Sequence, residues 1–145
     1  MARQVFFSFH YDRDHWRVSI VRNSRVIRGY DKSPFYDKAE WEKVKRKGDD
    51  AVRNWINAQM KGSSVTVVLL GKETGSRRWV KYEVKRSQEL GKGLIGIDIS
   101  KIKNQRGKTD ERGPNPLPSG TPLYLWNKGE GHKNLGDWID AAAPS

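Results

Sequence analysis

The 145-residue chain contains no cysteine, and this absence excludes several classes of site at once. Without a thiol there can be no disulfide, no thiolate-bound zinc, no iron–sulfur cluster and no cysteine nucleophile. Long apolar runs are missing as well: the segment 65–70 is far shorter than the roughly 20 residues that cross a bilayer. No apolar signal-peptide region follows the first residues. The sequence therefore predicts a single cytoplasmic domain over residues 1–145.

Apolar residues are also scarce, at 35% of the chain against roughly 45–50% in typical domains. Six Trp, five Tyr and four Phe compensate, because aromatic side chains bury the most area each. A packed core is therefore expected rather than a disordered basic chain.

Basic residues exceed acidic ones and give a net charge of +11. The excess is dispersed over the first 110 residues, whereas residues 111–145 are slightly acidic. Such a distribution is typical of solvated helix faces and loops. Nucleic-acid binding stays open as the last-ranked alternative, since no RRM, KH or zinc-finger signature is present. It would show a steep salt dependence.

Apolar, β-branched runs alternate with helical patterns along the chain. The expected strands cover residues 5–9, 65–70, 94–99 and 123–126, and the expected helices cover residues 12–23, 37–60, 76–90 and 135–142. The second helix is expected to break near Gly48, and Val26-Ile27 could add a short strand. Residues 100–122 are polar and then proline-rich, which predicts a long loop. This alternation favours an α/β domain whose parallel strands present ligands at their carboxyl ends.

Standard catalytic and cofactor motifs are absent. The segment 71–76 has the wrong spacing for a P-loop, and neither a GxGxxG nor a GxSxG motif occurs at a suitable place. The histidines at 10, 15 and 132 lack the spacing of an HExxH zinc site. The sequence thus predicts no bound metal.

The helix expected over residues 76–90 is the most informative, because it carries a carboxylate on its apolar side. At about 100° per residue, Glu83 falls between Trp79 and Val84 on the apolar arc. The same arc is expected to hold Leu90. An inward carboxylate is costly unless it is paired or used chemically. Glu83 is therefore either a structural group satisfied by a backbone amide or an arginine, or a functional one.

Two further sets of residues lie where ligands are expected. Ser8, Phe9 and His10 end the first strand with a hydroxyl, an aromatic ring and an imidazole. Asn115 stands between two prolines, whose rigid backbone could present its amide to a ligand. A structural role stays open for both sets: packing for the first, and an ordinary turn for Asn115.

Several blocks of sequence together resemble one known family. In this chain the blocks are VFFSFHY (5–11), VRN (21–23), SVTVVL (64–69), RRWVKYE (77–83) and GPNP (113–116). Their order resembles that of the TIR-like ThsB proteins of bacterial Thoeris antiphage defence systems. Several blocks in the same order are far more specific than any one of them, whereas the tail after Leu117 matches less well.

The resemblance implies a flavodoxin-like TIR fold, with a mostly parallel five-stranded sheet flanked by helices. It implies an enzyme that cleaves NAD at the nicotinamide–ribose bond and releases a cyclic ADP-ribose isomer, or a related ADP-ribose signal, in antiphage defence. NAD would be the substrate, with no cofactor. The signal would act on a separate effector protein. A phage-derived trigger and a homo-oligomeric active form are expected, with no membrane and no nucleic acid as partner.

By the same resemblance, the catalytic residue is the glutamate of a Trp-x-x-x-Glu pattern, here Trp79 and Glu83. The resemblance also implies that substrate is bound by Ser8, Phe9, His10 and Trp79, and that Phe35 and Asn115 close the pocket. Cleavage builds positive charge on the ribose, which one carboxylate can stabilise. The alternative is a non-catalytic TIR-like module that recognises a partner protein. Flavin binding would rest on fold analogy alone.

Overall fold

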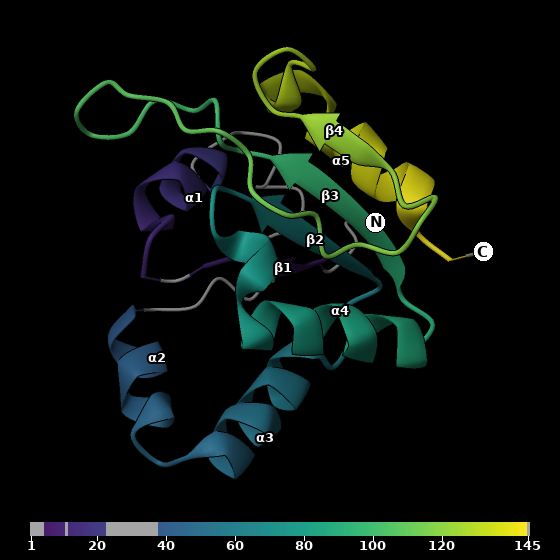
Figure 1. Ribbon diagram of the computed structural model, residues 1–145. Coiled ribbons are helices and arrows are strands. Elements are labelled where there is room, and N and C mark those ends of the chain that lie inside the picture. The colour runs from purple at the N-terminus through teal and green to yellow at the C-terminus, as the bar shows by residue number, and fades with distance from the viewer. Residues whose placement is uncertain (1–4, 11, 23–37, 145) are drawn as a thin grey trace.

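Figure 1 shows the computed structural model, in which residues 5–10, 12–22 and 38–144 are described. The elements are β1 (Val5–Ser8), α1 (His15–Arg22), α2 (Lys38–Lys45), α3 (Asp49–Met60), β2 (Val65–Leu70), a short 3-10 helix (Thr74–Ser76), α4 (Arg78–Glu89), β3 (Gly93–Asp98), β4 (Leu123–Leu125) and α5 (Gly131–Ala142). The chain contains both strands and helices as expected, and the α/β class is confirmed.

The four described strands form one parallel sheet in the order β1-β2-β3-β4. Val5 lies opposite Val65, and Val65 lies opposite Gly93, so the first three strands start level with one another. β4 joins further along β3, where Leu123 lies opposite Gly96. Because all the strands run in the same direction, the loops that follow β1, β2 and β3 gather at one edge of the sheet.

The described sheet has fewer strands than the five that the family resemblance implies. Within the described residues it has four strands, so the expected count is wrong for this part of the chain. The segment considered as a further strand, Val26-Ile27, lies outside the described residues. The parallel arrangement itself is confirmed.

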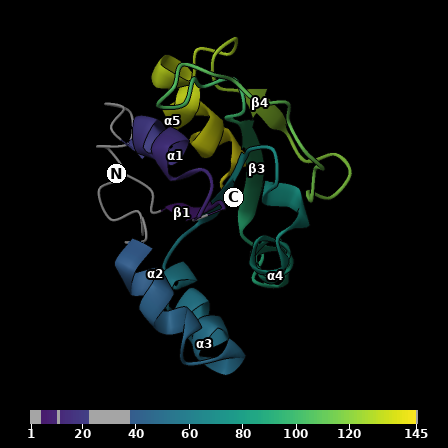
Figure 2. The same ribbon diagram turned by 60° about the vertical axis from the view of Figure 1, so that its left-hand side comes forward.

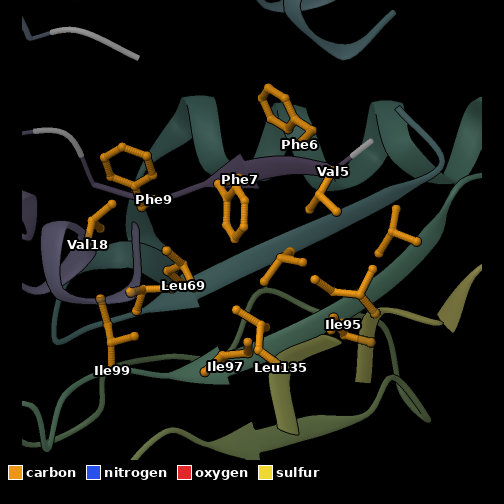
Figure 3. Packing of buried hydrophobic residues seen from close by; sticks show 14 of the residues in the cluster. Val5, Phe6, Phe7, Phe9, Val18, Leu69, Ile95, Ile97, Ile99 and Leu135 are labelled. Carbon is orange, nitrogen blue, oxygen red and sulfur yellow. The ribbon is translucent and has the colours of Figure 1, made fainter. Parts of the chain in front are cut away.

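Alternate side chains of the strands point to opposite faces of the sheet. Figure 3 shows Phe6 directed away from Val5 and Phe7, which lie on the same side as Leu135 of α5. In Figures 1 and 2, α1 and α5 cover that face, while α3 and α4 lie on the other. The side chains of both faces are almost fully buried, and each large one contributes about 1.5–3 kcal/mol of hydrophobic stabilisation.

The ends of α4 differ from the expected boundaries. The helix begins at Arg78, because Ser76 belongs to the preceding 3-10 helix and its hydroxyl donates to the Glu73 carbonyl. The helix ends before Leu90, whose side chain is 46% exposed, so the expectation that Leu90 lies on the apolar arc is wrong. The break at Gly48 is confirmed, with a φ of 100° that favours glycine.

The long loop between β3 and β4 folds back onto the loop between β2 and α4. The Gly113 N–H donates to the Gly71 carbonyl at 3.2 Å. A side chain at Gly113 would overlap the Lys72 carbonyl, and one at Gly75 would overlap the Pro114 carbonyl. These two glycines therefore allow the two backbones to approach closely.

Candidate active site

Glu83 lies on the inward side of α4 and is fully buried, at 0% exposure. The Ser8 hydroxyl at the end of β1 donates to Glu83 Oε1 at 2.7 Å. The second oxygen, Oε2, is buried and has no hydrogen-bond partner among the described residues. The inward position expected from the helical pattern is therefore confirmed. The partner found for the carboxyl is a hydroxyl, not the backbone amide or arginine that a structural role predicted.

The surroundings of Glu83 favour its neutral form. Burial raises the pKa of Glu83 to about 8, although the Ser8 hydrogen bond acts to lower it. The carboxyl is thus mostly protonated at pH 7. Buried polar atoms normally have partners, so a half-satisfied carboxyl is unusual in a protein interior. Strongly perturbed groups of this kind are candidates for chemistry.

A second polar pair, one turn further along α4, fixes the helix on the sheet. The Ser87 hydroxyl donates to the Glu83 carbonyl at 2.7 Å and lies 2.7 Å from the Thr66 hydroxyl of β2. Val80 and Val84 of the same helix pack with apolar side chains of β2. Polar and apolar contacts together therefore set where α4 holds Glu83 against the strands.

His10 lies two residues beyond Ser8 and is buried. Its Nδ1 accepts the Arg13 backbone N–H at 3.2 Å, so the neutral ring carries its proton on Nε2. Burial lowers the pKa of His10, and the nearby Arg77 guanidinium lowers it further, although neighbouring acids oppose both effects. His10 is therefore a neutral donor at physiological pH, close to the start of α4.

The remaining predicted site residues lie in other surroundings. Phe9 is 2% exposed and belongs to the main core, near Val18 of α1 (Figure 3). Asn115 is exposed, and its Oδ1 accepts the Leu117 N–H at 2.9 Å, as in an ordinary turn. Phe35 lies outside the described residues. For Phe9 and Asn115, the structural roles left open by the sequence account for these contacts.

Trp79, one turn before Glu83, borders a cavity of about 410 Å³. The Arg78 guanidinium stacks on the Trp79 ring, 4.4 Å from its centre, and Tyr82 meets the ring edge-on at 5.8 Å. The cavity is lined by residues of α2, α3, the end of the 3-10 helix and the start of α4 with the residue before it: Lys45, Asp49, Val52, Ser76, Arg77, Arg78 and Trp79. An aromatic ring beside several cations suits a ligand that is both flat and anionic.

An ion-pair network that sequence reasoning missed joins the long loop to α1. Asp110 Oδ2 accepts hydrogen bonds from Arg13 and Arg17, each at 2.8 Å. Arg17 also donates to the carbonyls of Ile102 and Lys108. The hydrogen bond from Arg13 and the charge of Arg17 hold the pKa of Asp110 below its usual range. No local pattern could reveal this network, because Asp110 lies 97 and 93 residues from its partners.

A second missed group, Asp14, joins α1 to the loop after β2. Its Oδ2 accepts the Thr74 hydroxyl at 3.1 Å, and that hydroxyl accepts the Gly71 N–H at 2.8 Å. Burial raises the pKa of Asp14. A side chain at Gly71 would overlap the Asp14 carboxyl, so the glycine makes room for this buried acid.

A larger cavity of about 480 Å³ lies between α1 and the long loop. Two of the arginines that line it, Arg13 and Arg17, already donate hydrogen bonds to Asp110. In the part of the chain that the structure describes, no group of three or more His, Asp or Glu side chains could hold a metal ion. In the same residues, no helix is long and apolar enough to cross a membrane.

Comparison with known proteins gives the family. The profile of the family described as "Thoeris protein ThsB, TIR-like domain" matches residues 6–104. A protein of Bacillus cereus (strain MSX-D12), named "Putative cyclic ADP-D-ribose synthase ThsB1", is 37% identical over 159 aligned residues. The alignment covers 99% of this chain and 83% of that protein. The chain belongs to the ThsB TIR-like family. The resemblance drawn from the sequence blocks is confirmed.

The profile match covers most of this ThsB-family chain, from the second residue of β1 to beyond β3, and includes Ser8 and Glu83. It ends at residue 104, ahead of Asn115 and of the tail where the sequence blocks agree less well.

Proposed function

We propose that this ThsB-family protein cleaves NAD at the bond between nicotinamide and ribose and releases a cyclic ADP-ribose type of signal. The observation that carries the proposal is the buried carboxyl of Glu83, held by Ser8 and one helical turn from Trp79. The name of the 37% identical relative refers to such a synthase activity.

The chemistry needs a single carboxylate. When the bond between C1′ and the pyridinium nitrogen breaks, its electron pair moves to that nitrogen and nicotinamide leaves as a neutral molecule. Positive charge remains on the ribose, as in glycoside hydrolysis. An ionised Glu83 stabilises this charge. A nucleophilic atom of the same dinucleotide then bonds to C1′ and closes the ring, which requires that water be excluded.

The other residues of the site have supporting roles in this proposal. Ser8 and His10 supply polar groups for the ribose at the end of β1, and Trp79 supplies a flat surface for a base. Phe9 supports this end of the strand from the core. Phe35 and Asn115 stay proposed as residues that close the pocket.

The charge state of Glu83 gives the proposal a pH dependence. The carboxyl is neutral below a pH of about 8, whereas the chemistry needs the carboxylate. NAD brings a pyridinium cation to the site, and a neighbouring cation lowers the pKa of a carboxyl. Substrate binding thus favours the ionised form, and kcat/KM, which reports the pKa of the free enzyme, rises with pH up to about 8.

We also propose how the protein acts in antiphage defence. NAD is the substrate, and no cofactor takes part. The product acts on a separate effector protein in the cytoplasm, after a phage-derived component triggers its synthesis. The active form is a homo-oligomer of the single 1–145 domain.

The decisive experiment compares the wild type with Glu83→Gln, which keeps the shape of the side chain but cannot ionise. Each protein is incubated with NAD at high protein concentration, with and without lysate from phage-infected cells. Mass spectrometry then measures NAD, nicotinamide and ADP-ribose products. We expect turnover in the wild type and its loss in the variant. Intact NAD throughout, or equal turnover by both proteins, would refute the proposal.

A second candidate function is a non-catalytic module that binds a partner protein. It is favoured by Trp16 and Ile20, which are 42% and 39% exposed one turn apart on α1. This function predicts that protection of cells against phage survives Glu83→Gln and is lost in Trp16→Ala.

A further inference from the structure

The cavity beside Trp79 is bordered by cations from separate elements. Arg78 is paired with Asp49 of α3 at 2.6 Å, so its charge is largely compensated. Lys45, at the end of α2, pairs with Glu42 of its own helix at 3.2 Å. Arg77 immediately precedes α4. Lys45 and Arg77 thus border the same cavity although they belong to different elements.

One carboxylate oxygen interacts with both of these cations. Asp12 Oδ2, in the loop after β1, lies 3.6 Å from Arg77 Nη2 and 3.7 Å from Lys45 Nζ. Charge-assisted hydrogen bonds are shorter, at about 2.7–2.9 Å. The three side chains are between 32% and 42% exposed, and ion pairs of this kind contribute little to stability. An anion with several oxygens can therefore replace Asp12 at little cost.

We propose that this cavity binds the diphosphate of the dinucleotide, with Arg77 and Lys45 as its ligands and Asp12 as the group that the diphosphate displaces. The inference rests on the proposed function and assigns the place of the phosphates in that substrate. The volume of about 410 Å³ is within the roughly 300–1,000 Å³ of small-molecule sites. The start of α4 at Arg78 adds the positive end of a helix dipole.

The distance between this subsite and Glu83 suits the substrate. Trp79 and Glu83 are four residues apart, which is a rise of about 6 Å along a helix. In NAD only a few covalent bonds separate C1′ of the reacting ribose from the nearest phosphorus. A ribose held at Glu83 therefore places the diphosphate near the level of Trp79 and Arg77. Arg77 is also close to the end of β1, because its Nη2 lies 3.6 Å from Asp12 Oδ2 in the loop after that strand.

The displacement of Asp12 by the diphosphate predicts that substitutions of the two cations and substitutions of Asp12 change the binding affinity in opposite directions. Removing the charge of Arg77 or Lys45 removes a ligand of the phosphates and weakens binding. Removing the charge of Asp12 frees Arg77 in advance, leaves Lys45 with Glu42 alone, and strengthens binding. A purely structural role for the three residues predicts no gain of affinity from any of these changes.

The test measures binding to the full chain by calorimetry at pH 7.5, with ADP-ribose and with inorganic pyrophosphate. We expect about tenfold weaker binding of ADP-ribose by Arg77→Gln, a smaller loss by Lys45→Gln, and several-fold tighter binding by Asp12→Asn. Lys81→Gln is the matched control, because it removes one exposed positive charge from α4, the helix that begins directly after Arg77. Nicotinamide riboside, which lacks the diphosphate, should bind Arg77→Gln and the wild type alike. Circular dichroism and thermal unfolding verify that each variant is folded.

Several results would overturn the subsite: no binding of ADP-ribose to the wild type, equal losses in Arg77→Gln and Lys81→Gln, or weaker binding by Asp12→Asn. If pyrophosphate alone binds with the expected pattern and ADP-ribose does not, the cavity is a site for free phosphates and the inference also fails. The proposed function is tested separately. NAD turnover with an unchanged KM in Arg77→Gln refutes the subsite alone, whereas the expected binding pattern without NAD turnover refutes the enzyme alone.

Discussion

Replacing Glu83 with glutamine should stabilise the protein, and the gain should increase with pH. The native fold holds the Glu83 proton up to a pH of about 8, whereas the unfolded chain releases it near the ordinary value of 4.5. Between these values the native state binds one proton more than the unfolded state. The free energy of unfolding therefore falls as pH rises through this window. Glutamine does not titrate, so the free energy of unfolding of the variant does not fall in this way.

The size of this change in the free energy of unfolding follows from the shift in the pKa of Glu83. Each pKa unit corresponds to 1.36 kcal/mol, so a rise from 4.5 to about 8 removes about 5 kcal/mol by the upper end of the window. This is a large part of the roughly 5–15 kcal/mol by which domains are stable. Between pH 5.5 and 7.5, the difference between Glu83→Gln and the wild type should grow by about 3 kcal/mol. Any cost of burying the glutamine amide is the same at both pH values and therefore cancels in this comparison.

The assay is urea unfolding of both proteins at pH 5.5, 6.5 and 7.5, monitored by tryptophan fluorescence. Glu89→Gln is the control, because it removes an exposed carboxyl from the last turn of the same helix. A constant difference between Glu83→Gln and the wild type would refute the reasoning. It would mean that Glu83 ionises normally in the folded protein, and that the site is open to water.

Three further predictions concern other parts of the structure. Ser8→Ala removes the hydrogen bond that lowers the pKa of Glu83, so this pKa should rise further. Carbon-13 NMR titration measures the rise, and NAD turnover at pH 7 should fall about tenfold. Arg17→Met leaves two loop carbonyls without their side-chain donor and Asp110 with Arg13 alone, and should cost about 3 kcal/mol in urea unfolding and expose the 103–109 segment to protease. Equal cleavage of variant and wild type would contradict this. Gly113→Ala forces a methyl group into the Lys72 carbonyl and should cost about 1–3 kcal/mol, whereas an unchanged melting temperature would show that the loop adjusts freely.

The parts of the fold that the sequence predicts best are those with a repeating pattern. The six-residue β2 is apolar and β-branched along most of its length and is buried on both faces, so its pattern has no competing interpretation. The inward position of Glu83 follows from helical rotation, which depends only on the spacing from Trp79 and Val84. These features are local, and local geometry is enough to give them.

Helix ends and distant contacts are harder to predict, because they depend on partners elsewhere in the fold. α5 begins at Gly131, four residues before the expected start at Leu135, and Gly131 packs closely against the Trp126 ring. A glycine in the sequence is typical of a loop, whereas a side chain at this position of the helix would overlap the Trp126 ring. Similarly, nothing near Asp12 or Asp110 in the sequence indicates the arginines that each one meets.

The form of β4 determines how copies of this chain can associate. β4 is one of the two outer strands of the described sheet, has only three residues and directly follows Pro122, which lacks an N–H. Short edge strands with proline resist the addition of a further strand from another molecule. Assembly by extension of the sheet past β4 is therefore disfavoured. Contacts between copies on this side must come from helices and loops, which can form and separate without opening the hydrogen-bonded core.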